Sequence, residues 1–367
     1  MKIGILTFHC AHNYGAVLQC YALQEYLKHL GHDAYVINYR PSYLKYGLFI
    51  WYNWLSLDPI KCIKKTIRQI CSFNLQYKRF TAFERFINDR LNVKTINLQS
   101  IQSDIDCFVF GSDQIWRKNG NQFDPIYFGE FKAAQGHKLI SYAASMGLDE
   151  LSETEKEQIG KWLKNFSTIT VRETSLKQLL SPLTDKKIEV VADPTFLLSQ
   201  QEWGKIAKAP NISKPYVLIY QVISNPLADE IAQTAARKLN AEIIEIASKI
   251  DNNPQNHCVV YTASPEEFLG WIKNACFVVT TSFHGTAFSV IFNRPFYCIK
   301  LNDGGDTRSA SLLKSIGLEN RLIDKSENPA FSSIDYSEAN KRLEYLQSKS
   351  TAFLTKAVEY ANKISVN

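Results

Sequence analysis

Short apolar runs alternate with helix-length amphipathic segments along most of this chain, and this alternation constrains the fold more than any other feature. The run from Ile3 to Thr7 leads through a polar loop into a segment with apolar residues at helical spacing, which ends at Gly31. A further apolar run, 33–39, follows at once. Strand, helix and strand in this order are typical of a parallel sheet with right-handed crossovers. The sequence therefore predicts an α/β fold whose ligands collect at the carboxyl ends of the strands.

The same alternation occurs in two series. In the first series, further strands are predicted at 106–112, 138–145, 168–173 and 188–194. A polar stretch that ends at Pro215 separates them from a second series, which begins with the apolar run 216–222. A chain of 367 residues usually forms more than one core, since single cores stop growing beyond about 250–300 residues. We therefore predict two Rossmann-like domains with a central cleft, a GT-B-like architecture, and place the boundary near 199–214.

The domain limits follow from this division. We assign residues 1–200 to an N-terminal Rossmann-like domain, with a basic aromatic insertion around 43–85, and residues 201–330 to a C-terminal Rossmann-like domain. Residues 336–363 are predicted to form a terminal helix that can pack back on the N-terminal domain.

Cysteine spacing and hydropathy bear on the compartment. The eight cysteines form no Cys-x-x-Cys pair and no paired Cys/His pattern, so the sequence favours reduced core thiols and predicts no metal site. The opening residues, MKIGILTF, lack the cleavage site of a signal peptide and fit a buried strand better. No run reaches the roughly 18 to 20 apolar residues that span a bilayer. We expect a cytoplasmic protein.

Two polar turns follow strands of the predicted N-terminal domain. The turn of Asn13, Tyr14 and Gly15 leads into a helix, whose free N–H groups and dipole suit a phosphate or carboxylate. A plain turn, with Asn13 as the helix cap and Gly15 for close packing, explains these residues equally well.

The second turn carries Ser112, Asp113 and Gln114 at the end of a strongly apolar strand. A carboxylate that faces the cleft can accept a proton from a sugar hydroxyl, which makes Asp113 a catalytic candidate and its two neighbours substrate-binding candidates. The structural alternative is a helix start capped by Ser112 or Asp113.

The predicted C-terminal domain places a histidine between an apolar strand and a helix. His284 stands beside Ser282 and Gly285, and its ordinary pKa lies near working pH, so it is a candidate acid or anion ligand. Lone histidines are more often structural, which is the alternative. Arg172 and Arg308 can each bind a phosphate or carboxylate bidentately, although surface salt bridges explain such arginines too.

The motifs occur in an order that resembles one family. The segments are NYGAVLQCYALQEYLKHLGH, DCFVFGSDQIW, SYAASMG, VRE, DPTFLL and TTSFHGTAFSVIFNRPF. Together, over about residues 1 to 320, they resemble the polysaccharide pyruvyl transferases, especially members encoded among bacterial surface-polysaccharide genes. Many members carry Ser-Arg-Leu-His-Gly where this chain has Thr281-Ser282-Phe283-His284-Gly285, so the family's arginine is replaced by Ser282.

The resemblance implies a reaction. The donor is phosphoenolpyruvate, bound on the C-terminal side, and no other cofactor is expected. The acceptor, on the N-terminal side, is a sugar of a capsule or exopolysaccharide or of its lipid-linked precursor, and the pyruvyl group becomes a cyclic ketal. With Ser282 in place of arginine, another cation must hold the donor phosphate or carboxylate.

Two other functions remain open. A GT-B glycosyltransferase using a nucleotide sugar would share the fold, because fold alone does not decide the donor. A non-catalytic relative that binds a glycan or an anion is the second. Nucleic-acid binding is not supported, since no recognised module accompanies the basic residues.

The insertion has the most unusual composition. From residue 59 to 85 the chain carries seven Lys or Arg and one Glu, a net charge of +6 that equals that of the whole chain. Aromatic residues that include Trp51 and Trp54 precede this stretch. A basic amphipathic helix beside aromatic anchors suits an anionic membrane, so we expect residues 49–70 to make peripheral contact with the inner face of the membrane. An ordinary helix with a solvated basic face is the alternative.

Overall fold

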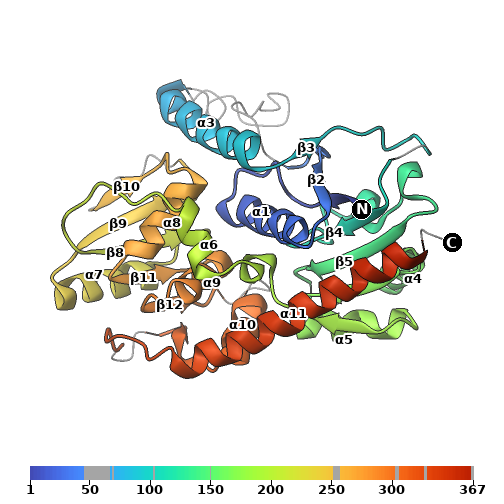
Figure 1. The fold of residues 1–367 in the computed structure, drawn as a ribbon. Helices are drawn as coiled ribbons and strands as arrows, with labels where there is room; N and C mark the ends of the chain where they lie inside the picture. Colours follow the sequence, from blue (N-terminus) through green and yellow to red (C-terminus); the bar gives the residue numbers. More distant parts are fainter. Residues whose placement is uncertain are drawn as a thin grey trace.

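Two lobes, each built around a parallel sheet, lie side by side in the computed structural model (Figure 1). The structure describes the chain apart from residues 45–66, 68–69, 102–103, 149, 251–256, 302–305, 326–328 and 365–367. Most of the segment predicted to contact a membrane, 49–70, therefore lies outside the described residues.

The first lobe contains a sheet in which seven described strands pair in the order β3-β2-β1-β4-β5-β6-β7, all parallel. The strands are β1 (Lys2–Leu6), β2 (Asp33–Ile37), β3 (Val93–Lys94), β4 (Cys107–Phe110), β5 (Lys138–Ala144), β6 (Thr168–Val171) and β7 (Ile188–Val190). The central strands are buried almost throughout because helices cover both faces, which explains their continuous apolar sequences.

Helices of the first lobe connect these strands. They are α1 (Tyr14–His29), α3 (Phe73–Arg90), α4 (Glu153–Leu163) and α5 (Thr174–Leu180), with short 3₁₀ turns at Pro125–Phe128, Lys132–Ala134, Ser181–Leu183 and Pro194–Leu197. Local sequence determines where several of these helices begin. Ser152 and Glu155, for example, form a reciprocal capping box at the N-terminus of α4.

The second lobe repeats this plan. Its six described strands pair in the order β10-β9-β8-β11-β12-β13, again all parallel. They are β8 (Tyr216–Gln221), β9 (Glu242–Ala247), β10 (Cys258–Val260), β11 (Phe277–Thr280), β12 (Phe296–Ile299) and β13 (Leu322–Ile323). The accompanying helices are α6 (Gln200–Ile206), α7 (Pro226–Leu239), α8 (Pro265–Asn274), α9 (Phe283–Ile291) and α10 (Asp306–Ile316), with a 3₁₀ turn at Glu319–Arg321.

Both sheets contain a point at which strand order reverses. In the first sheet it lies between β1 and β4, and in the second between β8 and β11. Connections leave such a point in opposite directions and open a crevice at the carboxyl ends of the strands. The α/β architecture of two Rossmann-like domains that the sequence predicted is confirmed.

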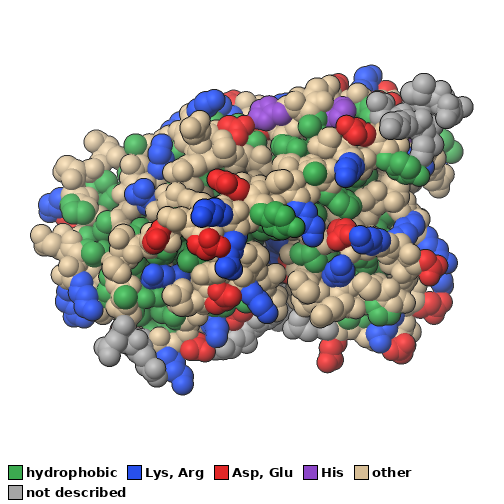
Figure 2. Space-filling view, turned by 60° about the horizontal axis from the view of Figure 1, so that its bottom comes forward, with side chains coloured by type: hydrophobic (Ala, Val, Ile, Leu, Met, Phe, Trp, Pro, Cys, Tyr) green, Lys and Arg blue, Asp and Glu red, His purple; other side chains and the backbone are tan. Residues whose placement is uncertain are grey.

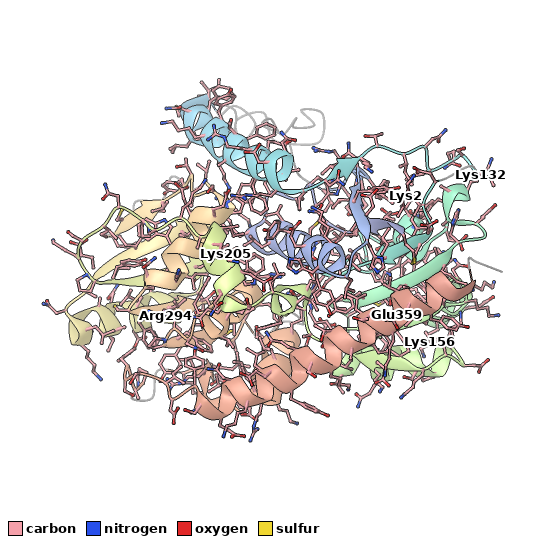
Figure 3. The ribbon with its side chains drawn as sticks, viewed as in Figure 1. Lys2, Lys132, Lys156, Lys205, Arg294 and Glu359 are labelled. Atoms are coloured by element: carbon pink, nitrogen blue, oxygen red, sulfur yellow. The ribbon has the colours of Figure 1, made fainter. Side chains whose placement is uncertain are left out.

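The lobes share a continuous apolar core. Tyr14 of α1 stacks on Phe268 of α8, with ring centroids 4.5 Å apart, and its hydroxyl donates to the Ala263 carbonyl at 2.9 Å. Arg79 of α3 donates to the Ala247 and Ser248 carbonyls at 2.8 and 3.1 Å. Side chains fill the space between the lobes (Figure 3). Because side chains of the first lobe are buried against the second, the two lobes form one packed unit.

The last described helix, α11 (Ser337–Ile364), runs along both lobes (Figure 1). It contacts α10 in the second lobe and β5 in the first. Its buried Ser350 accepts a hydrogen bond from the Ala192 amide at 2.9 Å, close to the carboxyl end of β7. This contact fixes the backbone just before Asp193. Among the described residues, no helix is long and apolar enough to cross a membrane.

Candidate active site

A pocket of about 260 Å³ lies where the reversal points of the two sheets meet. Residues of both lobes line it: Phe8, Ala11, Asn13, Ala16, Leu44, Asp113, Gln114 and Arg117 from the first, and Val222, Ile223, Thr281, Ser282, Phe283, His284, Leu301, Asp306, Arg308 and Ser309 from the second. Since the walls come from both lobes, a ligand bound here would contact both.

Two helix N-termini point into this region. The Asn13 side chain caps α1 by accepting from the Ala16 amide at 3.3 Å, and the Ser282 hydroxyl caps α9 by accepting from the Gly285 amide at 3.4 Å. Both caps line the pocket. The first N–H groups of a helix have no partner within the helix and carry partial positive charge. The pocket is therefore polarised to receive an anion.

The two helix starts touch through Gly15 and His284. A Cβ placed on Gly15 would lie 1.9 Å from Nδ1 of the His284 ring, so only a glycine lets the imidazole pack against the first turn of α1. The two turns that the sequence singled out in separate domains are thus in direct contact.

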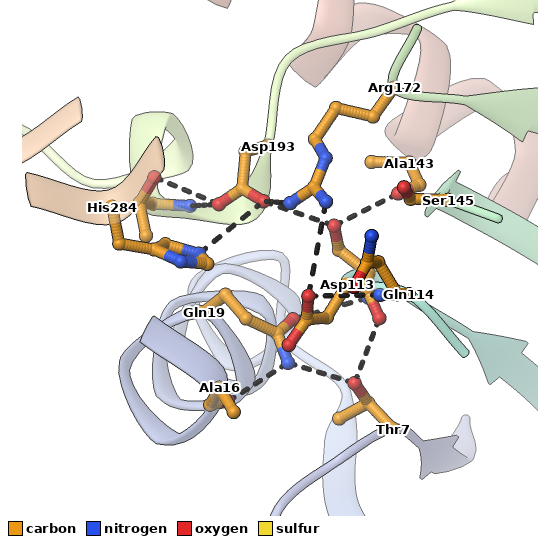
Figure 4. Close-up of polar contacts among 12 residues, drawn as sticks. Thr7, Ala16, Gln19, Asp113, Gln114, Ala143, Ser145, Arg172, Asp193 and His284 are labelled. Carbon is orange, nitrogen blue, oxygen red and sulfur yellow. Dashed lines mark hydrogen bonds and ion pairs between the residues drawn. The ribbon is translucent and has the colours of Figure 1, made fainter. Parts of the chain in front are cut away.

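Beside the pocket, charged side chains from neighbouring strand ends form a buried cluster around Arg172 (Figure 4). The guanidinium contacts Asp193 Oδ2 at 2.6 Å, Glu173 Oε1 at 3.2 Å and Asp113 Oδ1 at 3.9 Å. Ser145, at the end of β5, donates to Glu173 at 2.7 Å. These residues follow β4, β5, β6 and β7, which meet at one edge because the strands are parallel.

Asp193 connects this cluster to the second lobe. Its Oδ1 accepts from the Thr195 amide at 3.0 Å and from the Thr195 hydroxyl at 2.9 Å. Its Oδ2 accepts from Arg172 and from the Ser112 hydroxyl, the latter at 3.1 Å, and lies 3.9 Å from Nε2 of His284. The carboxylate is completely buried.

Burial and neighbouring charges shift the pKa values of this site. Burial lowers the pKa of His284, Asp193 and Asp113 act to raise it, and the positive charges of Arg172 and Arg308 lower it further, so the net direction is downward. Burial and the charge of Arg172 also lower the pKa of Arg308. Burial raises the pKa of Asp193, but Arg172 and His284 outweigh it and the net direction is downward. An anion in the pocket would relieve the cost of holding Arg308 and a protonated His284 there.

Several nitrogens near the site lack hydrogen-bond partners. Among the described residues, Nη2 of Arg172, Nε of Arg308 and Nε2 of His284 are buried and have no acceptor within hydrogen-bond distance. Leaving a buried donor unpaired costs about 1–3 kcal/mol, and more for charged groups. An unpaired donor on a charged group that lines a pocket, such as Nε of Arg308, is typical of a site completed by a ligand.

The predicted site residues fall into two groups. Those that line the pocket are Asn13, Asp113, Gln114, Ser282, His284 and Arg308. Ser112 and Arg172 lie behind them: Ser112 is buried against Asp193, and Arg172 borders a smaller cavity of about 50 Å³ that Arg308 also borders. Gly285 is buried against Thr280, and Gly15 contributes by admitting the His284 ring.

Tyr14, a predicted substrate-binding residue, is not among the residues that line the pocket. Its ring points away from the pocket into the junction between the lobes, where it stacks on Phe268 and is 1 % exposed. The reason is that α1 packs against the second lobe, so that one side of its first turn faces the pocket and the other faces α8.

Sequence reasoning missed several residues of this site, among them two carboxylates of the cluster and two residues of the pocket wall. Asp193 and Glu173 belong to quoted motifs, but no role was given to either. Arg117 and Phe8 line the pocket on the first lobe, and the guanidinium of Arg117 lies 5.7 Å from the centroid of the Phe8 ring. A usable signal existed for Asp193, because it directly follows an apolar strand, as His284 does.

Within the described part of the chain, no group of three or more His, Cys, Asp or Glu side chains could hold a metal ion.

Comparison with known proteins decides the family. The model of the polysaccharide pyruvyl transferase family matches residues 13–303, a range that includes the pocket residues Asn13, Asp113 and His284. The chain belongs to the polysaccharide pyruvyl transferase family. Family membership indicates a transferase that acts in polysaccharide pyruvylation. A comparison with curated proteins found no significant match.

Among solved structures, a UDP-GlcNAc 2-epimerase and a glycosyltransferase are similar to this pyruvyl transferase family member. The UDP-GlcNAc 2-epimerase of Methanocaldococcus jannaschii is 13% identical, with a TM-score of 0.50, over 98% of this chain and 100% of the epimerase. The glycosyltransferase SnogD of Streptomyces nogalater is 11% identical, with a TM-score of 0.45, over 98% of this chain and 99% of SnogD. At such identities the likeness concerns the fold alone.

Proposed function

We propose that this enzyme transfers the pyruvyl group of phosphoenolpyruvate to two hydroxyls of one sugar in a surface polysaccharide or its lipid-linked precursor, forming a pyruvate ketal. One observation carries the proposal. The capped starts of α1 and α9 and the unpaired Nε of Arg308 border the same pocket between the lobes. A small, highly charged anion such as phosphoenolpyruvate suits this combination.

The reaction balances without an added reagent. A proton adds to the methylene carbon of phosphoenolpyruvate, which becomes a methyl group and leaves a cationic centre at C2. A sugar hydroxyl forms the first C–O bond there and loses its proton, and the bond between C2 and the phosphate oxygen breaks. The second hydroxyl then closes the ketal. Of the two hydroxyl protons, one replaces the proton consumed at the methyl group and the other leaves with inorganic phosphate.

We assign the acid to His284 and the base to Asp113. Both line the pocket, His284 from the second lobe and Asp113 from the first, where the acceptor would enter. The side chain of Asp113 is partly exposed, as a group that exchanges protons with substrate requires. Arg308 supplies the cation for the donor that Ser282 cannot provide.

Binding of the negatively charged donor can itself protonate His284, the proposed acid. Burial and the charges of two arginines lower the pKa of His284, which favours the neutral ring. An anion near Arg308 offsets those positive charges and raises the pKa of His284, so the ring takes up a proton when the donor binds. The acid is then present when it is needed.

Incubation with phosphoenolpyruvate and a panel of lipid-linked mono- and oligosaccharides tests the proposal. We expect release of inorganic phosphate and a pyruvyl adduct detected by mass spectrometry. His284→Ala should lower turnover by about 100-fold or more with the fold intact, as for loss of an acid-base group. Release of UDP or GDP from a nucleotide sugar would favour a glycosyltransferase instead, and binding of phosphoenolpyruvate with no turnover on any acceptor would favour a non-catalytic relative.

We further propose that the basic insertion brings the enzyme to an anionic membrane, where a lipid-linked acceptor would reside. The described residues just before and within the start of α3 support this, because Ile67, Ile70, Phe73, Leu75 and Tyr77 are exposed. On the face in Figure 2, by contrast, basic and acidic side chains are interspersed. Clustered apolar and basic residues suit an interfacial segment.

Co-sedimentation with liposomes of phosphatidylcholine and phosphatidylserine tests the membrane contact. Each Lys or Arg near an anionic surface contributes about 1 kcal/mol, so changing Lys61, Lys64, Lys65 and Arg68 to Gln should reduce binding strongly. Added salt should have the same effect. Four Lys→Gln changes at residues 156, 161, 187 and 205, outside the insertion, serve as the matched control. Wild-type protein that stays in the supernatant at low salt would rule the contact out.

A further inference from the structure

We propose that Asp193 is a positioning residue for His284, holding the Nε2–H of the imidazole from across the boundary between the lobes. The inference rests on the proposed function in one respect, since it takes His284 as the acid of the pyruvyl transfer. The geometry itself is independent of any substrate, and it is tested first in the free protein.

The orientation of the Asp193 carboxylate is fixed on both oxygens. Oδ1 is held by the amide and hydroxyl of Thr195, and Oδ2 by Ser112 and Arg172. The amide of the preceding residue is held in turn by Ser350 of α11. A fully buried carboxylate with this many donors cannot swing toward solvent. It is therefore a rigid group against which another side chain can be oriented.

The His284 ring is seated against this carboxylate. Its Nε2 lies 3.9 Å from Oδ2 of Asp193 and is buried without any other partner among the described residues. On its other side the ring packs on Gly15. Within the described chain, Asp193 is the carboxylate that comes within 4.0 Å of His284, whereas Asp113 is engaged with the amide of Gln114 at 2.9 Å. A small ring movement brings Nε2 into hydrogen-bond distance of Asp193.

This arrangement fixes which nitrogen keeps its proton. A carboxylate accepts hydrogen bonds, so the neutral ring is held as the Nε2–H tautomer, and Nδ1 becomes the nitrogen that gains and loses the catalytic proton. The carboxylate also stabilises the imidazolium against its other charged neighbours: Asp113 acts in the same direction, while Arg172 and Arg308 act against it. Asp193 thus orients the acid and supports its charged form.

The tautomer can be measured in the wild-type enzyme without any substrate. Nitrogen-15 spectra of protein labelled at histidine give the tautomer of each ring, and the His284 signals are assigned by their loss in His284→Asn. We expect Nε2–H for neutral His284. An Nδ1–H tautomer would overturn the proposal, and this result requires neither turnover nor an altered cluster.

A substitution of Asp193 then tests how its charge affects the pKa of His284. Asp193→Asn should lower the pKa of His284, followed by the same spectra, by about one pH unit or more, because an opposite charge at 4–6 Å shifts a pKa by that amount. Glu173→Gln is the matched control: it removes a buried carboxylate that also contacts Arg172 but is not among the largest influences on the pKa of His284. Equal shifts in the two variants would mean that only the total charge of the cluster matters and would overturn the proposal.

Kinetics separate positioning from mere structural support. Asp193→Asn should lower kcat by about 100-fold or more, by analogy with other histidines that lose their orienting carboxylate. The pH profile of the residual activity should move to lower pH with the pKa of His284, while KM for phosphoenolpyruvate changes less than kcat. A loss of kcat with an unmoved pH profile would contradict positioning. If wild-type enzyme does not consume phosphoenolpyruvate, the proposed function fails, but the tautomer and pKa results still decide the role of Asp193.

Discussion

At the residue scale, Gly15 decides whether His284 can occupy its place. Gly15→Ala puts a methyl group 1.9 Å from the ring nitrogen, so either the imidazole or the first turn of α1 must move. We expect turnover to fall by at least about 10-fold, since misplacing a catalytic group by about 1 Å can cost 100-fold. Gly204→Ala in α6 is the control, because its Cβ meets only the flexible end of Lys273, at 3.2 Å. The rate of phosphate release from phosphoenolpyruvate is measured for both variants. Equal rates would show that the contact between Gly15 and His284 does not matter for turnover.

Arg308 and Ser282 provide a second prediction. Arg308→Ala should raise KM for phosphoenolpyruvate by about 10- to 100-fold, as for a lost charge-assisted hydrogen bond. Ser282→Arg in that background places a guanidinium on the same pocket wall, at the position where many family members carry arginine, and should recover part of the affinity. Ser309→Arg is the control, since it adds the same charge at a neighbouring position that lines the pocket. Recovery by both or by neither would argue against a specific exchange of cations.

The lowered pKa of His284 predicts proton uptake on anion binding. The free ring is mostly neutral near pH 7, and a bound anion raises its pKa, so affinity should increase as pH falls toward and below the pKa of the bound state. Sulfate is the suitable probe because its charge does not change in this range. Calorimetry in buffers of different ionisation enthalpy should show net proton uptake for the wild type and none for His284→Asn. An affinity independent of pH would contradict the coupling.

Some of these site residues could be predicted from the sequence and others could not. His284 and Asn13 could be found because each follows an apolar strand and opens a helix, and strand ends are where ligands bind. The contacts of Asp193 could not be predicted from the sequence. They join residues 112, 172, 193 and 284, whose proximity depends on the order of strands and on how the lobes meet. The same reason applies to Tyr14: its position on α1 was predictable, but not that this side of the helix faces α8.

At the element scale, α3 fastens the first lobe to the second through Arg79. The guanidinium is largely buried and donates to carbonyls at the carboxyl ends of β9 and β10. It also lies 5.2 Å from the centroid of the Tyr14 ring. Planar donors in a fixed fork suit this site, and an ammonium group does not reproduce them. The part of α3 around Arg79 therefore has a structural role, which is independent of what the exposed start of the helix contacts.

Arg79→Lys should accordingly destabilise the protein by about 2 kcal/mol or more, because buried carbonyls lose charged donors. Arg85→Lys, on the same helix but exposed, should change stability by less than about 0.5 kcal/mol. Denaturant unfolding followed by fluorescence gives both values. Similar stabilities for the two variants would mean that the contacts of Arg79 contribute nothing net.

At the scale of the whole molecule, the shared core predicts cooperative unfolding. Buried residues of α1 and α3 belong to the same apolar cluster as residues of α8 and α9, and α11 contacts both lobes. Calorimetry should show one transition, and sulfate should raise its midpoint because it binds only the folded protein. Two separate transitions would indicate lobes that unfold independently.

The contact of Tyr14 and Arg79 with the second lobe also limits how such enzymes can be recombined. A chimaera that takes residues 1–214 from this chain and the remainder from another family member would insert an aromatic ring and a guanidinium into a surface shaped for different side chains. Because the acceptors of these donors are main-chain carbonyls, any displacement of that surface would leave the Tyr14 hydroxyl and the Arg79 guanidinium buried without partners. Successful grafts must therefore carry the facing residues of α1, α3 and α8 as a set.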